Sequence, residues 1–235
     1  MKKITMKQWK HFSVALCALG IIAGTVAMPL PVAAEETRLP VTITLPAPDT
    51  AGGMSVMQAL SQRKTTRSFA DAALSEQQLS ALLWAANGIN RPESGKRVNP
   101  TTMGIYCIDV YAVMADGIYK YDPEAHRLTL VSTEDFRPKI NAKQTFVHTA
   151  PLTLVFVSNP VPPRDPSRPA NPERQHANNC LVAGTMLQSV ALVAVDKGLG
   201  SCVRGSIDRD AFSKAARLAP DQKVLISQTI GMIAK

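Results

Sequence analysis

The chain has 235 residues, which is long enough to bury one sizeable hydrophobic core and predicts a single domain. Hydrophobic residues make up 46% and charged residues 19%, a composition that excludes a disordered or fibrous protein. Four of the 26 basic residues lie in the first 34 positions, which hold no acidic residue. The remaining 22 basic and 18 acidic residues form no long basic stripe, so nucleic acid is not an expected partner.

The first 34 residues have the parts of a secretory signal peptide. Four lysines precede an uncharged apolar run from Phe12 to Met28, and Val32-Ala33-Ala34 provides small residues before a cut site. This order predicts cleavage after Ala34 and export, to the periplasm or as a secreted bacterial protein. The alternative is an uncleaved membrane anchor, since the apolar run approaches the length of a membrane span. Membrane contact is expected only through this segment.

Residues 35–53 are rich in Pro, Gly and Thr and are predicted to be a flexible lead-in, or an edge strand over the β-like run 41–45. The domain itself is expected to span residues 54–235. Its first helix is predicted to begin at Ser55, where Gln58 completes a capping box, and to end near Gln62.

A second helix is predicted from Ser75, with Gln78 completing its capping box and Gly88 ending it. Alternating apolar residues then predict an antiparallel meander of three strands over 106–113, 117–121 and 127–131. We expect a short helix around 133–144 and a buried strand over 152–157.

Six prolines make 159–175 a loop, either a surface linker or a lid over a cleft. A long, largely apolar helix is predicted from Ala177 to Lys197, and its apolar residues surround the axis, which suggests burial against a second subunit. A β-like pair at 202–203, a helix capped by Asp208 and a last strand over 223–233 complete the chain. Because helices and strands mix without a βαβ rhythm, the predicted class is α+β.

Three cysteines follow the signal segment, and this odd number excludes a disulfide scaffold. Cys107, Cys180 and Cys202 are each expected to be buried free thiols. The histidines after residue 34 lie far apart in sequence, so no local metal site is predicted.

A cationic cluster, Arg63-Lys64-Thr65-Thr66-Arg67, follows the first helix. Forked guanidinium donors, an ammonium group and hydroxyls converging from one short segment suit a phosphate monoester. The alternative is that these cations only complement the dipole at a helix C-terminus. From the residues alone, both interpretations stay open.

Five blocks in order resemble the nitroreductase-like flavoproteins, in the branch related to the SagB and thiazole-forming oxidases. They lie at 63–88, 97–103, 108–123, 198–205 and 228–231 and together cover most of 54–235. The resemblance implies a central mixed or antiparallel sheet flanked by helices, in an intertwined homodimer with FMN at the interface.

The same resemblance assigns the flavin-binding positions. Arg63, Lys64, Thr65 and Arg67 would hold the phosphate, with Lys235 as a late contact. A second group would lie along the ring and ribityl chain from the partner subunit: Pro100, Thr101, Thr102 and Met103. A third group would pass close to the ring: Ser201, Cys202 and Gly205.

The leading functional hypothesis is an FMN-dependent oxidoreductase, a reductase or dehydrogenase with ping-pong electron transfer to a small-molecule substrate. No catalytic side chain is nominated, because flavin chemistry takes place on the cofactor. Tyr106 or Tyr111 could donate a proton, although Tyr111 also fits a core position. The alternatives are an exported flavin-binding module without turnover, and a cofactor-free interaction protein. Neither the substrate nor the electron donor follows from the sequence.

Overall fold

The computed structural model describes residues 41–161 and 171–234. The predicted signal peptide, residues 35–40 of the lead-in and Lys235 lie outside these ranges. One seven-stranded sheet runs through the domain in the order β1-β6-β5-β4-β7-β9-β8. Its strands are β1 (Thr42–Thr44), β4 (Ile108–Met114), β5 (Gly117–Asp122), β6 (Arg127–Ser132), β7 (Leu152–Ser158), β8 (Leu199–Arg204) and β9 (Lys223–Met232). Every pairing in this sheet is antiparallel.

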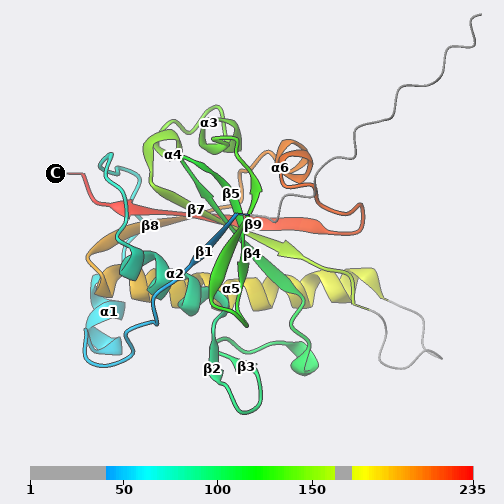
Figure 1. Cartoon of the computed structure of the whole chain (residues 1–235), viewed down its shortest axis with the longest axis horizontal. Helices are drawn as coiled ribbons and strands as arrows, with labels where there is room; N and C mark the ends of the chain where they lie inside the picture. Colours follow the sequence, from blue (N-terminus) through cyan, green and yellow to red (C-terminus); the bar gives the residue numbers. More distant parts are fainter. Residues whose placement is uncertain (1–40, 162–170, 235) are drawn as a thin grey trace, which may run out of the picture. The chain divides into compact units, whose positions relative to one another are not determined.

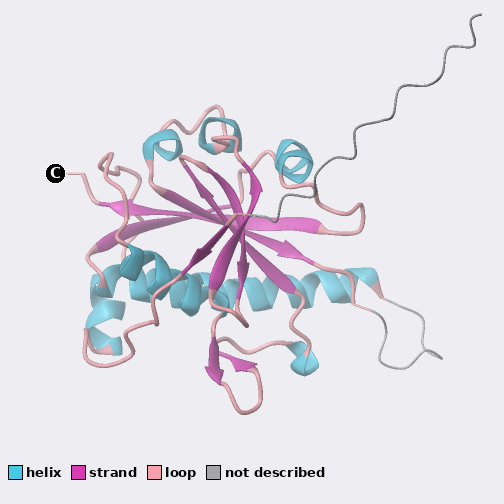
Figure 2. Cartoon of the chain, viewed as in Figure 1, coloured by secondary structure: helices cyan, strands magenta, loops and turns pink. Residues whose placement is uncertain are grey.

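The helices cover both faces of the sheet (Figures 1 and 2). Their bounds are α1 (Val56–Gln62), α2 (Glu76–Asn87), α3 (Arg137–Ile140), α4 (Phe146–Thr149), α5 (Pro172–Asp196) and α6 (Arg209–Ala215). Figure 1 shows α5 with α1 and α2 on one side of the sheet, and α3, α4 and α6 on the other. This mixture of helices and an antiparallel sheet confirms the predicted α+β class.

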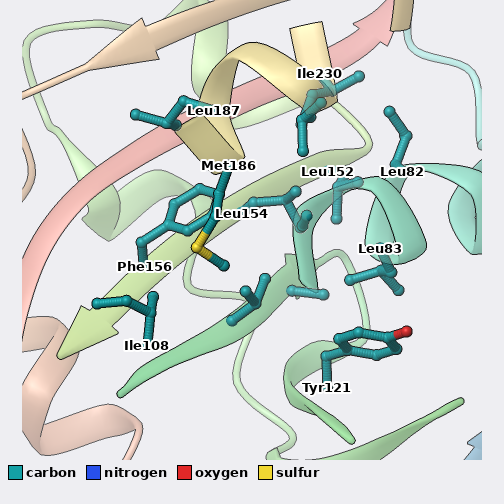
Figure 3. Packing of buried hydrophobic residues seen from close by; sticks show 14 of the residues in the cluster. Leu82, Leu83, Ile108, Tyr121, Leu152, Leu154, Phe156, Met186, Leu187 and Ile230 are labelled. Carbon is teal, nitrogen blue, oxygen red and sulfur yellow. The ribbon is translucent and has the colours of Figure 1, made fainter. Parts of the chain in front are cut away.

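Two large hydrophobic clusters hold these layers together, and a third, small one joins Phe69, Ala150 and Cys202. The larger lies between the sheet and α2 with α5, where Met186 and Leu187 pack beside Leu154 and Phe156 (Figure 3). The second large cluster lies on the opposite face, beneath α3, α4 and α6. Its centre includes Phe212, which is fully buried and meets the Tyr111 ring edge-on. Tyr111 is therefore a core aromatic, and burial followed by the charge of Asp109 raises its pKa to about 12.

Both predicted capping boxes are present. Ser55 Oγ accepts the Gln58 N–H at 3.2 Å while Gln58 Oε1 accepts the Ser55 N–H at 3.0 Å, and Ser75 and Gln78 repeat the pattern at α2. Gly88 ends α2 with φ −69°, so it does not serve as a left-handed cap. Glycine is needed there because a Cβ would lie 2.2 Å from Trp84 Cδ1.

The short helix expected around 133–144 is instead divided into α3 and α4. Asn141 leaves helical geometry at φ −160°, and its Oδ1 accepts the backbone N–H groups of Lys143 and Gln144. Its Nδ2 donates to the carbonyl of Ser206, 65 residues further along the chain. A polar side chain that bonds its own backbone competes with the helix, and a distant contact fixes this outcome.

The long helix α5 begins at Pro172, five residues before the predicted Ala177. Asn171 caps it by accepting the Arg174 N–H at 2.9 Å, and proline is tolerated in the first turn because its missing N–H would have no helical partner. The proline-rich loop is correspondingly shorter. The lid hypothesis falls mainly on 162–170, which lie outside the described residues.

One face of α5 is buried on the sheet and α2, and the other is exposed. Val182, Met186, Leu187 and Val190 are at most 9% exposed, whereas Leu181 is 71% exposed. By length and apolar composition α5 could cross a membrane, but its packing against the sheet accounts for much of that apolar character. The outer face is a stripe, smaller than the sequence suggested, whose exposed residues are His176, Ala177, Cys180, Leu181, Gly184, Thr185 and Gln188.

Two further elements lie outside the main sheet. A hairpin of β2 (Ile89–Arg91) and β3 (Lys96–Arg97) follows α2, and the 3-10 turn η1 spans Thr102–Gly104. Neither was predicted. At one edge of the main sheet β1 pairs with β6, which confirms the edge-strand alternative for this part of the lead-in.

Candidate functional site

The cationic segment after α1 runs alongside β8, the edge strand of the sheet. Thr65 pairs with Ser201 in a parallel bridge, and the Thr66 N–H donates to the Ser201 carbonyl at 2.9 Å. Further along, Phe69 pairs with Ile233. Two sequence blocks more than 130 residues apart, 63–67 and 201–205, therefore meet within one subunit.

This segment carries positive charge that nothing described neutralises. Arg63, Lys64 and Arg67 are exposed, and in residues 41–161 and 171–234 no carboxylate forms an ion pair with them. Arg67 lies beside the thiol of Cys202, which is 2% exposed. Burial raises the pKa of the Cys202 thiol, and Arg67 and Arg204 oppose that effect only in part. Cys202 is therefore protonated near neutral pH.

The outer edge of β8 offers backbone groups to a ligand. Because the Ser201 carbonyl faces Thr66, alternation along an antiparallel strand turns the N–H and carbonyl of Val203 to the same outer side. Val203 is 46% exposed. Beyond the segment that pairs with Thr65 and Thr66, this edge therefore lies open to a ligand.

The turn that follows β8 has its carbonyl oxygens held by side chains. Ser227 Oγ donates to the Arg204 carbonyl at 3.1 Å, and Arg209 Nη2 donates to the Gly205 carbonyl at 3.2 Å. The Ser206 carbonyl accepts from Asn141 Nδ2 at 3.1 Å and from Arg204 Nη1 at 3.3 Å.

In a trans peptide the N–H points opposite to the carbonyl, so the amides of residues 205–207 face away from these donors. Among the described residues no acceptor engages these three N–H groups. Gly205 and Ser206 are exposed. The amides of Gly205 and Ser206 are therefore available to a ligand, in the turn that follows the strand with which the cationic segment pairs.

Residues 100–103 lie elsewhere in the subunit. Asn99 anchors this segment to α2 and α5, because its Nδ2 donates to the carbonyls of Ala85 and Ala86 and its Oδ1 accepts from Ser189. The Thr101 hydroxyl donates to the Ile105 carbonyl, and Met103 is 58% exposed at φ 56°. No hydrogen bond or strand pairing among the described residues joins 100–103 to 63–67 or 201–205.

The predicted late contact, Lys235, lies outside the described residues. Its neighbour Ala234 donates its N–H to the Ser68 carbonyl at 3.2 Å. The end of the described chain thus lies next to the cationic segment.

Sequence reasoning missed Arg204. This side chain is 4% exposed, on the same face of β8 as Cys202. The signal was available: in an alternating strand, Arg204 falls at an inward position two residues after Cys202. Cys180 was also predicted wrongly, because it lies on the outer face of α5 and is exposed.

A cavity of about 240 Å³ lies away from the predicted flavin-binding residues. It is lined by Asp71–Leu74, Leu79, Met114–Asp116, Arg137 and Pro151. None of the residues that the sequence nominated contributes to its wall, so this cavity does not mark the nominated site.

An antiparallel sheet between two helical layers, with an exposed cationic segment paired to one edge strand, defines an α+β fold with a cationic edge. The chain belongs to the nitroreductase family, whose model, described as "Nitroreductase family", matches residues 60–232. Oxidoreductase activity is the activity that this membership indicates.

Two relatives support the assignment. A crystal structure of a protein from Ralstonia eutropha JMP134, named as a nitroreductase, is 38% identical with a TM-score of 0.74, over 84% of this chain and 94% of that chain. A protein of Methanocaldococcus jannaschii with a nitroreductase name is 26% identical over 63% of this chain and 76% of its own length.

More distant structures share the fold alone. The Escherichia coli microcin synthetase McbBCD complex has a TM-score of 0.61 at 19% identity, over 90% of this chain and 85% of the matched chain. The NADPH:FMN oxidoreductase of Vibrio harveyi, complexed with NAD+, has a TM-score of 0.57 at 14% identity, over 77% and 69% of the two chains.

Proposed function

We propose that this protein is an FMN-dependent oxidoreductase that works as a homodimer and transfers electrons in two steps through the bound flavin. One observation carries the proposal: three exposed cations without a described carboxylate partner, Arg63, Lys64 and Arg67, lie on a segment that pairs at Thr65 and Thr66 with β8, the strand that leads into the turn at Gly205. A phosphate monoester is complementary to these cations, and an electron-rich ring edge is complementary to the free amides of that turn.

The residues present fit FMN. Arg63, Lys64, Thr65 and Arg67 would bind the phosphate, with Lys235 as a further contact. Ser201, Cys202 and Gly205 would lie close to the ring, and the backbone groups free to contact it on the open edge of β8 are those of Val203 and the N–H of Gly205. When bound, FMN supplies the hydride-transfer chemistry, while the protein supplies orientation and excludes water.

A second subunit is required to complete this site. Pro100, Thr101, Thr102 and Met103 share no hydrogen bond with the cationic segment of their own subunit, so in the proposed dimer they reach the flavin of the partner. Exposed apolar side chains on α1 and α5 support such an interface, notably Met57 at 74% and Leu181 at 71% exposure.

Two neighbours make the proposal more specific. The Vibrio harveyi structure is named for FMN oxidoreductase activity, and the microcin synthetase complex supports the SagB-like branch that the sequence blocks resemble. Both likenesses concern the fold. We propose the same cofactor and branch for this chain.

We also propose that residues 1–34 direct export and are removed after Ala34, with an uncleaved anchor as the alternative. Reduced nicotinamides are scarce outside the cytoplasm, so the donor in that compartment would be another electron carrier. Mass spectrometry of protein from the native host decides between the two. A chain that begins at Glu35 supports cleavage, and intact residues 1–34 in the membrane fraction support the anchor.

Ligand titration tests the proposed site. Purified residues 35–235 are titrated with FMN and with riboflavin, followed by flavin fluorescence. Arg63→Ala and Arg67→Ala each remove one charged hydrogen bond, so FMN should bind roughly 10–150-fold more weakly. Riboflavin lacks the phosphate and should respond little. Lys214→Ala, an exposed cation on α6, is the matched control.

Three results would contradict parts of the proposal. Equal losses for FMN and riboflavin would mean that these arginines support the fold rather than the phosphate. Binding of FMN that cannot be reduced and reoxidised would favour the flavin-binding module. Absence of flavin binding would favour the cofactor-free interaction protein.

A further inference from the structure

Arg204 is a buried cation whose charge has no counter-ion among the described residues. Its side chain is held by neutral acceptors only: Nε donates to Thr229 Oγ1 at 3.2 Å, and Nη1 donates to Gln144 Oε1 at 3.1 Å and to the Ser206 carbonyl. The Nη2 group is buried without a partner. The Phe146 ring centroid lies 6.0 Å from the guanidinium carbon.

Stability does not account for this arrangement. A guanidinium in the interior loses its hydration, and neutral acceptors return only part of that free energy. Burial lowers the pKa of Arg204, but arginine stays protonated at any physiological pH. An apolar side chain of similar volume would pack beside Phe146 and Cys202 without these losses. The charge therefore calls for a role other than holding the fold together.

The guanidinium acts on the turn that follows β8. Through Nη1 it fixes the carbonyl of Ser206, the same oxygen that Asn141 engages, while Arg209 fixes the carbonyl of Gly205. Because each N–H of a trans peptide points away from the carbonyl before it, fixing the Gly205 and Ser206 carbonyls also fixes the N–H groups of residues 206 and 207, which point away from Arg204 and Arg209. The turn thus presents N–H dipoles outward, with a buried positive charge behind them.

We propose that Arg204 is a positioning residue for the flavin: it orients the amides after β8 and places an uncompensated positive charge behind them, so that reduced FMN is bound more tightly than oxidised FMN. This inference rests on the proposed function. A positive charge within a poorly solvated wall favours whichever ligand state carries more negative charge, and reduction adds electrons to the ring.

The test uses the FMN-loaded mature protein and the reduction potential of the bound flavin, measured by equilibration with redox dyes. Arg204→Gln keeps a hydrogen-bond donor and removes the charge, so the preference for reduced FMN should fall about tenfold and the potential should become more negative. Arg204→Lys keeps the charge and should recover most of the loss. Lys214→Gln removes an exposed charge on α6 and should shift nothing.

Arg204→Met separates positioning from a structural role. Replacing a buried, unpaired charge by an apolar side chain should leave thermal stability equal or higher while lowering the potential as Arg204→Gln does. Folded variants with an unchanged potential would overturn the proposal. So would failure of both neutral variants to fold, because Arg204 would then be required for structure. If the wild-type protein takes up no FMN, the proposed function fails first, and that result is distinct from a bound flavin whose potential ignores Arg204.

Discussion

Thr66 and Gly200 lie in direct contact: a Cβ added to residue 200 would stand 2.7 Å from Cβ and Cγ2 of Thr66. No side chain fits at that distance without displacing a neighbour. The glycine therefore lets the cationic segment pair with β8, which brings Arg63, Lys64 and Arg67 to the outer edge of the sheet.

Gly200→Ala is expected to push the segment away from β8. We predict a loss of about 1–3 kcal/mol in the free energy of unfolding, as for other overpacked sites, together with weaker FMN binding. Lys214→Ala is the control, because it alters an exposed side chain on α6 and should change the free energy of unfolding by no more than about 0.5 kcal/mol. Chemical denaturation and FMN titration measure both effects. A Gly200→Ala protein with the wild-type free energy of unfolding and the wild-type FMN affinity would show that close packing of Thr66 on residue 200 is not required.

Local chemistry accounts for the parts of the fold that the sequence predicts well. The helices after Ser55, Ser75 and Asp208 begin where a side chain caps the first turn, and such caps depend on residues three positions apart. The meander of β4, β5 and β6 follows from alternating apolar residues separated by short turns. The segment 152–157 is apolar because both faces of β7 are buried.

Long-range contacts decide the parts that were predicted wrongly. Nothing near Asn141 in the sequence reveals that Ser206 would accept its amide and divide α3 from α4. The start of α5 is a different case, because its signal is local: Asn171 caps the helix through the N–H of Arg174 and Pro172 occupies the first turn, a pattern that the sequence-based prediction missed. Free cysteines are usually buried, and Cys180 was predicted to be so. Its exposure depends instead on which face of α5 meets the sheet.

The candidate site also combines features that the sequence predicts with features that only the folded chain reveals. The cationic cluster and residues 201–205 could be nominated from the sequence, but the backbone pairing of the cluster with β8 through Thr66 and Ser201 could not. Arg204 was not nominated, although its inward position two residues after Cys202 on an alternating strand was readable from the sequence.

His126 forms a polar cluster that ties the lead-in to the domain. Its Nδ1 lies 2.8 Å from the Tyr121 hydroxyl, and its Nε2 lies 2.8 Å from Ser80 Oγ and 3.1 Å from the Pro46 carbonyl. A neutral ring protonated on Nε2 satisfies all three contacts. Burial lowers the pKa of His126 below its ordinary value of 6.5, and the hydrogen bond to Pro46 opposes that shift.

This cluster predicts a loss of stability in mild acid. The unfolded chain takes up a proton near pH 6.5 while the folded chain resists it, so the free energy of unfolding should fall as the pH drops below that value. His126→Asn, which tolerates the observed φ of 46°, should remove the pH dependence and cost about 1–3 kcal/mol at neutral pH. Denaturant melts from pH 5 to 8 measure this, with His148→Asn as the comparison. An unchanged slope in His126→Asn would refute the assignment.

The outer face of α5 predicts a homodimer. Leu181 is 71% exposed and Gly184 has open space above it, so a second subunit could approach closely along this stripe. Wild type should scatter as a dimer at low micromolar concentration with or without FMN, through an interface above about 2,000 Å². Leu181→Asp should give a folded monomer that binds FMN weakly, because the partner's residues 100–103 are lost.

Lys143→Asp makes a larger change in charge than Leu181→Asp, but on the α3–α4 side of the sheet, and should remain dimeric (Figure 1). Light scattering measures the oligomeric state and FMN titration measures flavin affinity, and together they test whether α5 forms the dimer interface. A stable wild-type monomer, or a Leu181→Asp dimer with normal flavin affinity, would show that α5 does not form the interface.

Cys202 tests whether electron transfer depends on any single side chain. It is 2% exposed beside the proposed ring contacts, and burial raises its pKa, so it remains a neutral thiol rather than a nucleophilic thiolate. Cys202→Ala and Cys202→Ser should therefore leave reoxidation of dithionite-reduced FMN within about tenfold of wild type, or about 1.4 kcal/mol of barrier. A general acid would cost about 100-fold or more. Stopped-flow decay with a quinone acceptor measures the rate, and the visible spectrum confirms that the flavin stays bound.

Cys107→Ala is the matched control, since it removes another buried thiol that contacts Asn179, away from β8. Loss of reoxidation in Cys202→Ala alone, with FMN in place, would make Cys202 a catalytic residue.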